Sequence, residues 1–459
     1  MPISEKLYHF WAKKPRKVMH PAKLIALVFA AIILIGAAFL MLPFSSRSGI
    51  SCGFVPALFT ATSATCVTGL SLFDTYTQWS GFGQLIILLL IQLGGLGFMS
   101  IASLLLFMLG RRVGLKERMV IAQALSVNDL DAVVRLQKTV LIGSFAIEAV
   151  GAVVLMFRFL PEVGFLQALK WGVFHSVSAF CNAGFDIFGV VEPGSSLVTF
   201  QSDPVVLLTI SALIIIGGLG FLVWQEIVSG RKWKLCGVYT KLVIIANLVL
   251  LVGGAAAFLA LEWNNPQTLG PMALGDKLLN GFFQSVTTRT AGFASFDQVG
   301  LSDGGKGVSM VLMLIGGSSG STAGGVKTVT VMVLMLFLWS RLRGRNTVTV
   351  FKRTIPAEQV LDAMTLTGIM VVLAVFGAVF ISATSAIGFT DSLYEAVSAL
   401  ATVGLTAGST GKLSLAGKLL IILYMYFGRV GVLTLSMGFL LSDRAAERIR
   451  YAQTNLLIG

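Results

Sequence analysis

The chain has 459 residues, of which 56% are hydrophobic and 12% are charged, about half of the ~25% charged share of an ordinary globular protein. Glycine contributes 50 residues. This composition excludes a disordered chain, a disulfide scaffold and an ordinary cytosolic enzyme. The net charge of +13 does not indicate nucleic-acid binding, because the basic residues lie between long apolar runs rather than on one polar face. We therefore expect a polytopic membrane protein.

Eight apolar stretches are long enough to span a membrane, since a hydrocarbon core of ~30 Å takes about 20 helical residues. In chain order they lie near residues 24–42, 82–109, 139–157, 204–229, 242–261, 307–340, 364–384 and 416–440. Between the members of each pair lies a shorter apolar segment, too short to span and better interpreted as a re-entrant helix. These four segments lie near residues 55–65, 169–180, 278–288 and 391–401.

The distribution of basic residues predicts the sidedness of the chain. Of the 34 lysines and arginines, 24 fall in the segments 1–23, 110–138, 230–241, 341–363 and 441–459. Positive residues accumulate on the cytoplasmic side of membrane proteins. We therefore predict a multi-pass protein of the cell membrane with both termini in the cytoplasm.

Each re-entrant segment ends in a related string with an aromatic start, small hydroxylated residues and one glycine followed by Leu or Phe. The strings are FTATSATCVTGL at 59–70, FHSVSAFCNAGF at 174–185, FQSVTTRTAGF at 283–293 and YEAVSALATVGL at 394–405. A second string follows in the next helix: LGGLGF at 93–98, IGGLGF at 216–221, IGGSSG at 315–320 and FGRVGV at 427–432. Two coupled motifs that recur four times in register predict an internal fourfold repeat.

The repeat divides the chain into six parts. They are a cytoplasmic N-terminal segment (1–23), four repeats (24–110, 139–230, 242–341 and 364–441) and a cytoplasmic C-terminal tail (442–459). Small residues let membrane helices pack closely, so packing stays open as a role for the glycines of the second string. The glycines of the first string end segments that do not span, so their backbone must line protein or a water-filled cavity.

Four non-spanning helices in one chain predict a pseudo-fourfold pore. The expected fold is an all-α membrane protein with eight transmembrane helices and four re-entrant pore helices, arranged as four M1-P-M2 repeats. Backbone carbonyls of the glycine loops can replace the hydration shell of a cation, as in the rings that select K⁺. The fourth loop, Thr402-Val403-Gly404, matches the start of the K⁺-channel filter TVGYG, although no loop has the second glycine of that filter.

These motifs, the eight-span plan and the length resemble the Trk/Ktr/HKT superfamily of potassium transporters, and within it the KtrB-type membrane subunits of bacterial Ktr uptake systems. The resemblance implies K⁺ uptake, and Gly69 favours K⁺ because Na⁺-transporting plant relatives carry serine there. Permeability to Na⁺ is the alternative within the superfamily. The implied filter, which binds K⁺ through backbone carbonyls, comprises Cys66, Val67, Thr68, Gly69, Asn182, Ala183, Gly184, Thr290, Ala291, Gly292, Thr402, Val403 and Gly404.

The third post-loop helix departs from the others. Residues 307–340 would form a helix of about 50 Å, too long for the membrane, and GGSSGSTAGG at 316–325 is a poor helix former. In KtrB-type proteins a broken helix at this position forms an intramembrane gate beneath the filter, together with an arginine of the fourth helix. The implied gate comprises Gly316, Gly317, Ser318, Ser319, Gly320, Ser321, Thr322, Ala323, Gly324, Gly325, Lys327 and Arg429. For Lys327, snorkelling to the cytoplasmic interface is the alternative.

Other charged residues near the loops have simpler assignments. Asp74, Asp186 and Asp297 follow three of the loops and would concentrate cations at the outer mouth, unless they are ordinary solvated loop charges. Arg289 is expected to brace the third loop from behind, with no carboxylate partner evident from the sequence. Glu148, in the third span, is expected to be a structural partner inside the protein, with cation coupling as the alternative.

Two rival mechanisms fit the sequence less well. An alternating-access carrier predicts two inverted halves, whereas the four units here share one orientation. A serine protease could use Ser319 in Gly317-Ser318-Ser319-Gly320, but it needs a histidine in a neighbouring span. Only His175 lies near the membrane, at the outer end of a re-entrant helix. We therefore predict that the chain is not an enzyme.

The partners follow from the resemblance. KtrB-type subunits are homodimers on a cytosolic ring of KtrA-like RCK subunits that bind ATP or ADP, whereas no nucleotide motif occurs in this chain. Na⁺ dependence is common in the family, but no residue here demonstrates it. The basic loops 110–138, 230–241 and 341–363 are either docking surfaces or ordinary positive-inside loops. The apolar tail Tyr451–Gly459 suits burial at a dimer interface. The lipid bilayer is the remaining partner, and no nucleic acid is expected.

Overall fold

The computed structural model describes residues 21–97, 130–230 and 232–431. The predictions for the loop 110–138 therefore lie largely outside the described residues, as do those for the N-terminal segment and the C-terminal tail. The spans predicted at 82–109 and 416–440 are described only in their first parts.

The first two repeats each contain a first helix, a re-entrant pore helix and a second helix. In the first repeat these are α2 (Pro21–Leu40), α3 (Phe54–Thr65) and α5 (Gly81–Leu96), with a short α4 (Thr75–Gln78) before α5. In the second repeat they are α8 (Leu130–Val163), α9 (Phe165–Phe180) and a second helix in two pieces, α10 (Pro204–Gly218) and α11 (Phe221–Val228). The two pieces meet at 99°, a bend that we did not predict from the sequence.

The last two repeats follow the same order. The third contains α12 (Val238–Glu262), α13 (Leu274–Thr287) and a second helix broken into α14 (Asp303–Leu314) and α15 (Thr328–Leu342). The fourth contains α16 (Ala357–Thr384), α17 (Phe389–Leu400) and α18 (Leu415–Val430). Between them, β1 (Val348–Val350) and β2 (Arg353–Ile355) form an antiparallel hairpin, with Val348 opposite Ile355. This hairpin is the one addition to the predicted all-helical fold in the described part of the chain.

The helices confirm an all-α membrane protein. Within the described residues, four helices are long and apolar enough to cross a membrane, and they are the first helices of the four repeats, α2, α8, α12 and α16. The bent pair α10–α11 adds a fifth candidate. The full number of eight spans stays a prediction, because two of the second helices continue beyond the described residues and the third is broken.

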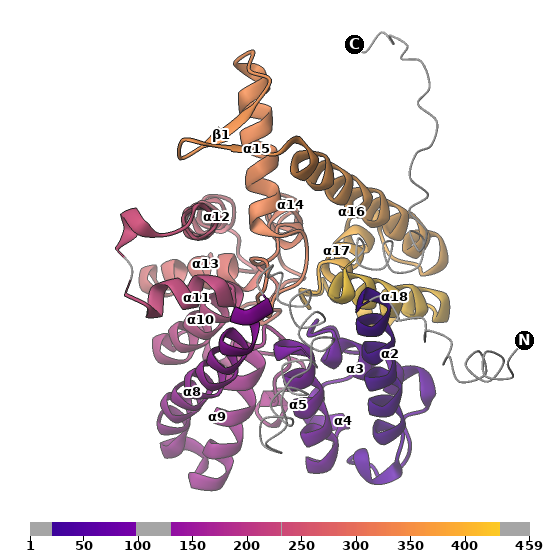
Figure 1. The fold of residues 1–459 in the computed structure, drawn as a ribbon. Coiled ribbons are helices and arrows are strands. Elements are labelled where there is room, and N and C mark those ends of the chain that lie inside the picture. The colour runs from indigo at the N-terminus through magenta and orange to yellow at the C-terminus, as the bar shows by residue number, and fades with distance from the viewer. Residues whose placement is uncertain (1–20, 98–129, 231, 432–459) are drawn as a thin grey trace, which may run out of the picture.

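Figure 1 shows the four repeats following one another in chain order round the middle of the molecule. Each second helix packs against the pore helix of the next repeat, and the last closes on the first. The contacting pairs are α5 with α9, α10 with α13, α14 with α17, and α18 with α3. Fourfold closure therefore arises from one contact used four times, as the repeated sequence requires.

Burial is inverted relative to a water-soluble protein. The first helices expose large apolar side chains, such as Val252 of α12 at 60% and Val372 of α16 at 68%. The pore helices bury polar ones, such as Ser398 and Glu395 of α17, both at 0%. Because lipid is the outer solvent and polar groups must be satisfied inside, this arrangement suits a membrane protein with a polar centre.

The second helices start at side-chain caps. The Ser80, Ser302 and Ser414 hydroxyls each accept a hydrogen bond from the backbone N–H three residues later, and the Asp203 carboxylate accepts two. Such a residue satisfies backbone donors that the first turn leaves free.

The glycines of the second string determine where these helices end or bend. The third glycine of every string, at Gly97, Gly220, Gly320 and Gly431, has a positive φ of 68° to 93°, which interrupts a right-handed helix. The first glycine has a packing role in three repeats. A Cβ on Gly94, Gly217 or Gly428 would lie 1.8 to 2.2 Å from a carbonyl oxygen at the end of a pore helix. The glycines thus serve both close packing and bending.

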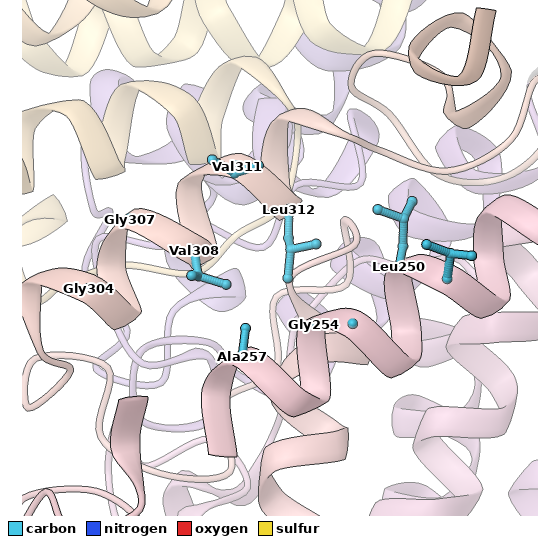
Figure 2. A pocket seen from close by; sticks show the side chains of 10 residues that line it. Leu250, Gly254, Ala257, Gly304, Gly307, Val308, Val311 and Leu312 are labelled. Atoms are coloured by element: carbon cyan, nitrogen blue, oxygen red, sulfur yellow. The ribbon is translucent and has the colours of Figure 1, made fainter. Parts of the chain in front are cut away.

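An apolar hollow of about 390 Å³ lies between α12 and α14. Figure 2 shows Gly254 and Ala257 of one helix facing Gly304 and Val308 of the other. Only glycine, alanine, valine and leucine line the hollow, so it offers no side-chain ligand for a cation and does not resemble an ion path.

Candidate functional site

The four glycine loops share an unusual backbone conformation. The loop glycines Gly69, Gly184, Gly292 and Gly404 have φ values of 67° to 96°. Two residues earlier, the non-glycine residues Val67, Asn182, Thr290 and Thr402 also have positive φ, between 52° and 68°. Left-handed residues at alternate positions turn successive carbonyls toward one side, whereas a regular extended strand alternates them. Four identical departures from the ordinary backbone indicate one shared purpose.

The loops form a closed ring. A Cβ on Gly69 would lie 2.6 Å from the carbonyl oxygen of Ala183, and a Cβ on Gly184 would lie 2.6 Å from that of Ala291. The same relation joins Gly292 to Val403 at 2.3 Å and Gly404 to Thr68 at 2.1 Å, which closes the circle. Each glycine is therefore required by its neighbouring loop as well as by its own φ.

A hydroxyl at the same place in each pore helix holds its loop. The N–H groups of Gly69 and Gly404 donate to the hydroxyl oxygens of Ser63 and Ser398, both at 3.1 Å. The hydroxyls of Ser178 and Thr287 instead donate to the carbonyls of Phe185 and Phe293, both at 2.6 Å. We noted small hydroxylated residues in the sequence but assigned them no role. Their fourfold recurrence was the signal that could have revealed it.

A second brace lies further out, at the residue that follows the aromatic start of the string. The imidazole of His175 accepts the N–H of Ile187 at Nε2 and contacts the Trp171 carbonyl at Nδ1. Glu395 accepts hydrogen bonds from Thr406 and Thr410, and Gln284 exchanges two with Gln298, all three from post-loop segments. Both ring nitrogens of His175 are therefore engaged in holding the second loop, which leaves the protease hypothesis without a free base.

The predicted filter residues come together as one buried group. The non-glycine members are at most 1% exposed: Cys66, Val67, Thr68, Asn182, Ala183, Thr290, Ala291, Thr402 and Val403. In the described part of the chain, the hydroxyls of Thr68, Thr290 and Thr402 have no hydrogen-bond partner. Carbonyl and hydroxyl oxygens without hydrogen-bond donors around them are the ligands that a dehydrated alkali cation needs.

The break in the third second helix forms a loop that touches other repeats. Its base is pinned by a parallel bridge between Ile315 and Val326. Toward the second repeat, the N–H of Ser318 donates to the Gly218 carbonyl at 3.0 Å, and the Thr322 hydroxyl donates to the Phe180 carbonyl at 3.2 Å. Toward the fourth repeat, a Cβ on Gly324 would lie 2.0 Å from the Thr402 hydroxyl oxygen. The loop therefore lies directly against the filter loops.

Arg429 ties this loop to the first repeat. Its guanidinium donates to the carbonyl of Thr322 in the loop and to the carbonyls of Gly94 and Gly95 in α5. Lys327 caps the other end, since its ammonium donates to the Ala323 carbonyl at 2.7 Å. Both cations are thus bound to backbone carbonyls in or beside the loop, which favours a role for Lys327 there over snorkelling.

The two remaining buried charges have uncharged partners. Arg289 donates to the amide oxygen of Asn247 and, at 3.4 Å, to the Gly316 carbonyl. Glu148 accepts two hydrogen bonds from the Gln92 amide, at 3.0 and 3.1 Å. These contacts agree with the structural roles that we expected for both residues.

The acidic residues of the outer side are also loop caps. The Asp74 carboxylate accepts the N–H of Thr77 at 2.7 Å, and that of Asp297 accepts the N–H of Val299 at 2.9 Å. Asp186 differs, because burial and then the nearby charge of Asp74 raise its pKa to about 7. The structure thus brings Asp74 and Asp186 together, while Asp297 caps its own turn in the third loop.

The fold and the ring define an all-helical membrane transport protein with a pseudo-fourfold centre. Comparison with known families identifies it further. Residues 4–447 match the TrkH family, described as cation transport protein, and the chain belongs to this family. It is a family of transporters rather than of enzymes.

Characterised relatives align over almost the whole chain. The chain is 40% identical to the potassium/sodium uptake protein NtpJ of Enterococcus hirae, covering 97% of this chain and 99% of the relative. It is 38% identical to the Ktr system potassium uptake protein B of Bacillus subtilis, covering 96% and 97%, and 37% identical to that of Vibrio alginolyticus, covering 95% and 94%. These relatives confirm the resemblance to KtrB-type subunits.

The fold itself has a solved counterpart. The crystal structure of the potassium transporter TrkH from Vibrio parahaemolyticus superposes with a TM-score of 0.72, covering 94% of this chain and 86% of that one. The two chains are 18% identical, so this similarity supports the fold alone.

Proposed function

We propose that this protein takes up K⁺ across the cell membrane through the ring of loops at Gly69, Gly184, Gly292 and Gly404. The observation that carries the proposal is the closed ring, in which each glycine lies against the carbonyl that precedes the next. Such a ring can replace the hydration shell of a cation without a charged side chain. The names of the relatives, potassium uptake proteins over nearly the full length, support K⁺ as the ion.

The loop between α14 and α15 would be the gate, comprising Gly316–Gly325 with Lys327 and Arg429. It is supported by the position of the loop against the Thr402 side chain and by its bonds to the first and second repeats. A positive guanidinium held at the axis by carbonyls would repel K⁺ electrostatically. Opening would require Arg429 to exchange its bond to Thr322 for others.

Regulation and assembly follow from the kinship to Ktr subunits. We propose a homodimer in the cell membrane, with both termini cytoplasmic, on a cytosolic KtrA-like RCK ring that binds ATP or ADP. Asp74, Asp186 and Asp297 would raise the local cation concentration at the outer mouth.

Permeability to Na⁺ is the second candidate. It is favoured by one relative, which is named for potassium and sodium uptake. The glycines at all four ring positions favour K⁺, because a side chain there would narrow or distort the carbonyl ring.

The test is ion uptake in a bacterium that lacks its own potassium uptake systems. The full chain, expressed with a KtrA-like subunit, should restore growth at low K⁺ and take up K⁺ faster than Na⁺. Equal or faster Na⁺ uptake would favour the second candidate, and no uptake of either ion would refute the proposal. Deleting three residues within Gly316–Gly325 should raise the flux or remove its response to nucleotide, whereas an unchanged flux would exclude a gate.

A further inference from the structure

Arg289 is a buried cation that lies between the filter and the gate. It is 7% exposed, and within the described residues it forms no ion pair with a carboxylate. A charge in a protein interior is costly unless hydrogen bonds hold it. The position of this guanidinium is therefore set by the few groups that accept its hydrogen bonds.

Those groups come from two different parts of the third repeat. One is the amide oxygen of Asn247, in the middle of α12, and the other is the carbonyl of Gly316, the first glycine of the gate loop. The Asn247 amide nitrogen also donates to the Val243 carbonyl at 2.7 Å and to the Ser318 hydroxyl at 3.4 Å. Asn247 thereby orients its oxygen toward Arg289 and contacts the gate loop at the same time.

The network continues to the far end of the loop. The Ser318 hydroxyl lies 3.3 Å from the Thr328 hydroxyl, at the start of α15. Asn247, Ser318 and Thr328 are at most 6% exposed. One buried polar network therefore joins the third filter strand to both ends of the broken helix.

The repeats differ at the position of this cation. Three residues before the ring glycine, the other repeats carry the small neutral residues Cys66, Cys181 and Ala401, whereas the third carries Arg289. In the described part of the chain, only the third repeat also has a gate loop in its second helix. The cation thus occurs in the repeat where a filter strand and a gate loop must be connected.

We propose that Arg289 is a positioning residue that couples the gate loop to the third filter strand. Arg289 directly precedes Thr290, whose left-handed backbone starts the strand of carbonyls. A displacement of Gly316 would leave the guanidinium held by Asn247 alone, and loss of Asn247 would free the strand to move with the loop. The proposal rests on the proposed function, since it concerns the ion preference of the same ring.

The experiment removes the anchor without touching the filter or the gate. Asn247→Leu keeps a similar volume but takes away the oxygen that holds Arg289, while Asn247→Asp keeps that oxygen. Tyr239→Phe is the matched control, because its hydroxyl donates from the same helix to the Ser319 carbonyl at 2.8 Å and does not contact Arg289. Initial rates of K⁺ and Na⁺ uptake are measured in cells, at equal amounts of protein in the membrane.

We expect the ratio of K⁺ to Na⁺ uptake to fall by about tenfold in Asn247→Leu, the order of magnitude for losing a hydrogen bond to a charged group. Asn247→Asp should keep the ratio within about twofold, and Tyr239→Phe should keep it too, whatever its effect on the rate. An unchanged ratio in Asn247→Leu would overturn the inference, as would an equal fall in Tyr239→Phe.

If Asn247→Leu does not reach the membrane, Asn247→Ser provides the same test, because serine is too short to reach Arg289 and is tolerated more easily than leucine among polar groups. A wild-type chain that transports neither ion would refute the proposed function, which is a different outcome from a wild type with normal uptake and insensitive Asn247 variants.

Discussion

A single methyl group at Gly292 should abolish selective uptake. In Gly292→Ala the added Cβ would lie 2.3 Å from the Val403 carbonyl oxygen, whereas an ordinary contact is 3.4 Å or more, so the fourth loop would have to retreat by about 1 Å. The φ of 83° adds about 1–2 kcal/mol of backbone strain for a residue with a side chain.

The control separates strain from collision. Gly49 also has a positive φ, of 72°, but a Cβ there meets nothing within 4 Å. Gly49→Ala therefore carries similar strain without the contact, and it lies in an outer loop. We expect K⁺ uptake to fall at least tenfold in Gly292→Ala and to stay within about twofold in Gly49→Ala.

The assay is initial K⁺ and Na⁺ uptake in cells lacking other potassium uptake systems, with membrane abundance measured by immunoblot. Normal abundance with lost K⁺ uptake, or with lost preference for K⁺, would agree with a carbonyl ring. Normal uptake and normal preference in Gly292→Ala would refute the reasoning, because the neighbouring loop could not then be an ion ligand.

Three further predictions use other parts of the structure. Gly217→Ala should reduce transport or abundance strongly, since its Cβ would lie 2.0 Å from the Phe180 carbonyl, whereas Gly218→Ala, with its nearest atom at 3.5 Å, should be tolerated; equal effects would contradict the packing role. Ser398→Ala should lower the thermal stability of the purified protein by about 1 kcal/mol and weaken K⁺ selectivity, because the Gly404 N–H loses its acceptor, and an unaltered melting temperature and selectivity would exclude the brace. Because the raised pKa of Asp186 makes this carboxyl neutral below about pH 7, the apparent K⁺ affinity should fall between pH 8 and 6 in the wild type but stay flat in Asp186→Asn; a wild-type pH dependence that persists in the variant would exclude this group.

Much of the fold was predictable because a repeated sequence constrains itself. The re-entrant segments predicted at 55–65, 169–180, 278–288 and 391–401 correspond to α3, α9, α13 and α17 within a few residues. The break predicted at 316–325 occurs between Leu314 and Thr328. Ten residues that are mostly glycine and serine favour helix poorly, and the apolar segment around them is too long for one span, so both signals place the break there.

Other features could not be predicted in the same way. The 99° bend at Gly220 was missed because glycine in a membrane helix indicates packing as readily as a turn. Asn247 was missed because nothing in α12 reveals which residue of a distant loop it contacts. The hydroxyls of Ser63 and Ser398 carried a signal, their equal place in the repeat, but the direction of a side chain needs coordinates.

The most direct test of the central claim is the position of the ion itself. A structure of the full assembly in Rb⁺ should show anomalous density on the axis of the four loops, within carbonyl reach of Thr68, Ala183, Ala291 and Val403. Rb⁺ density elsewhere in the membrane region, with none inside the ring, would contradict the account.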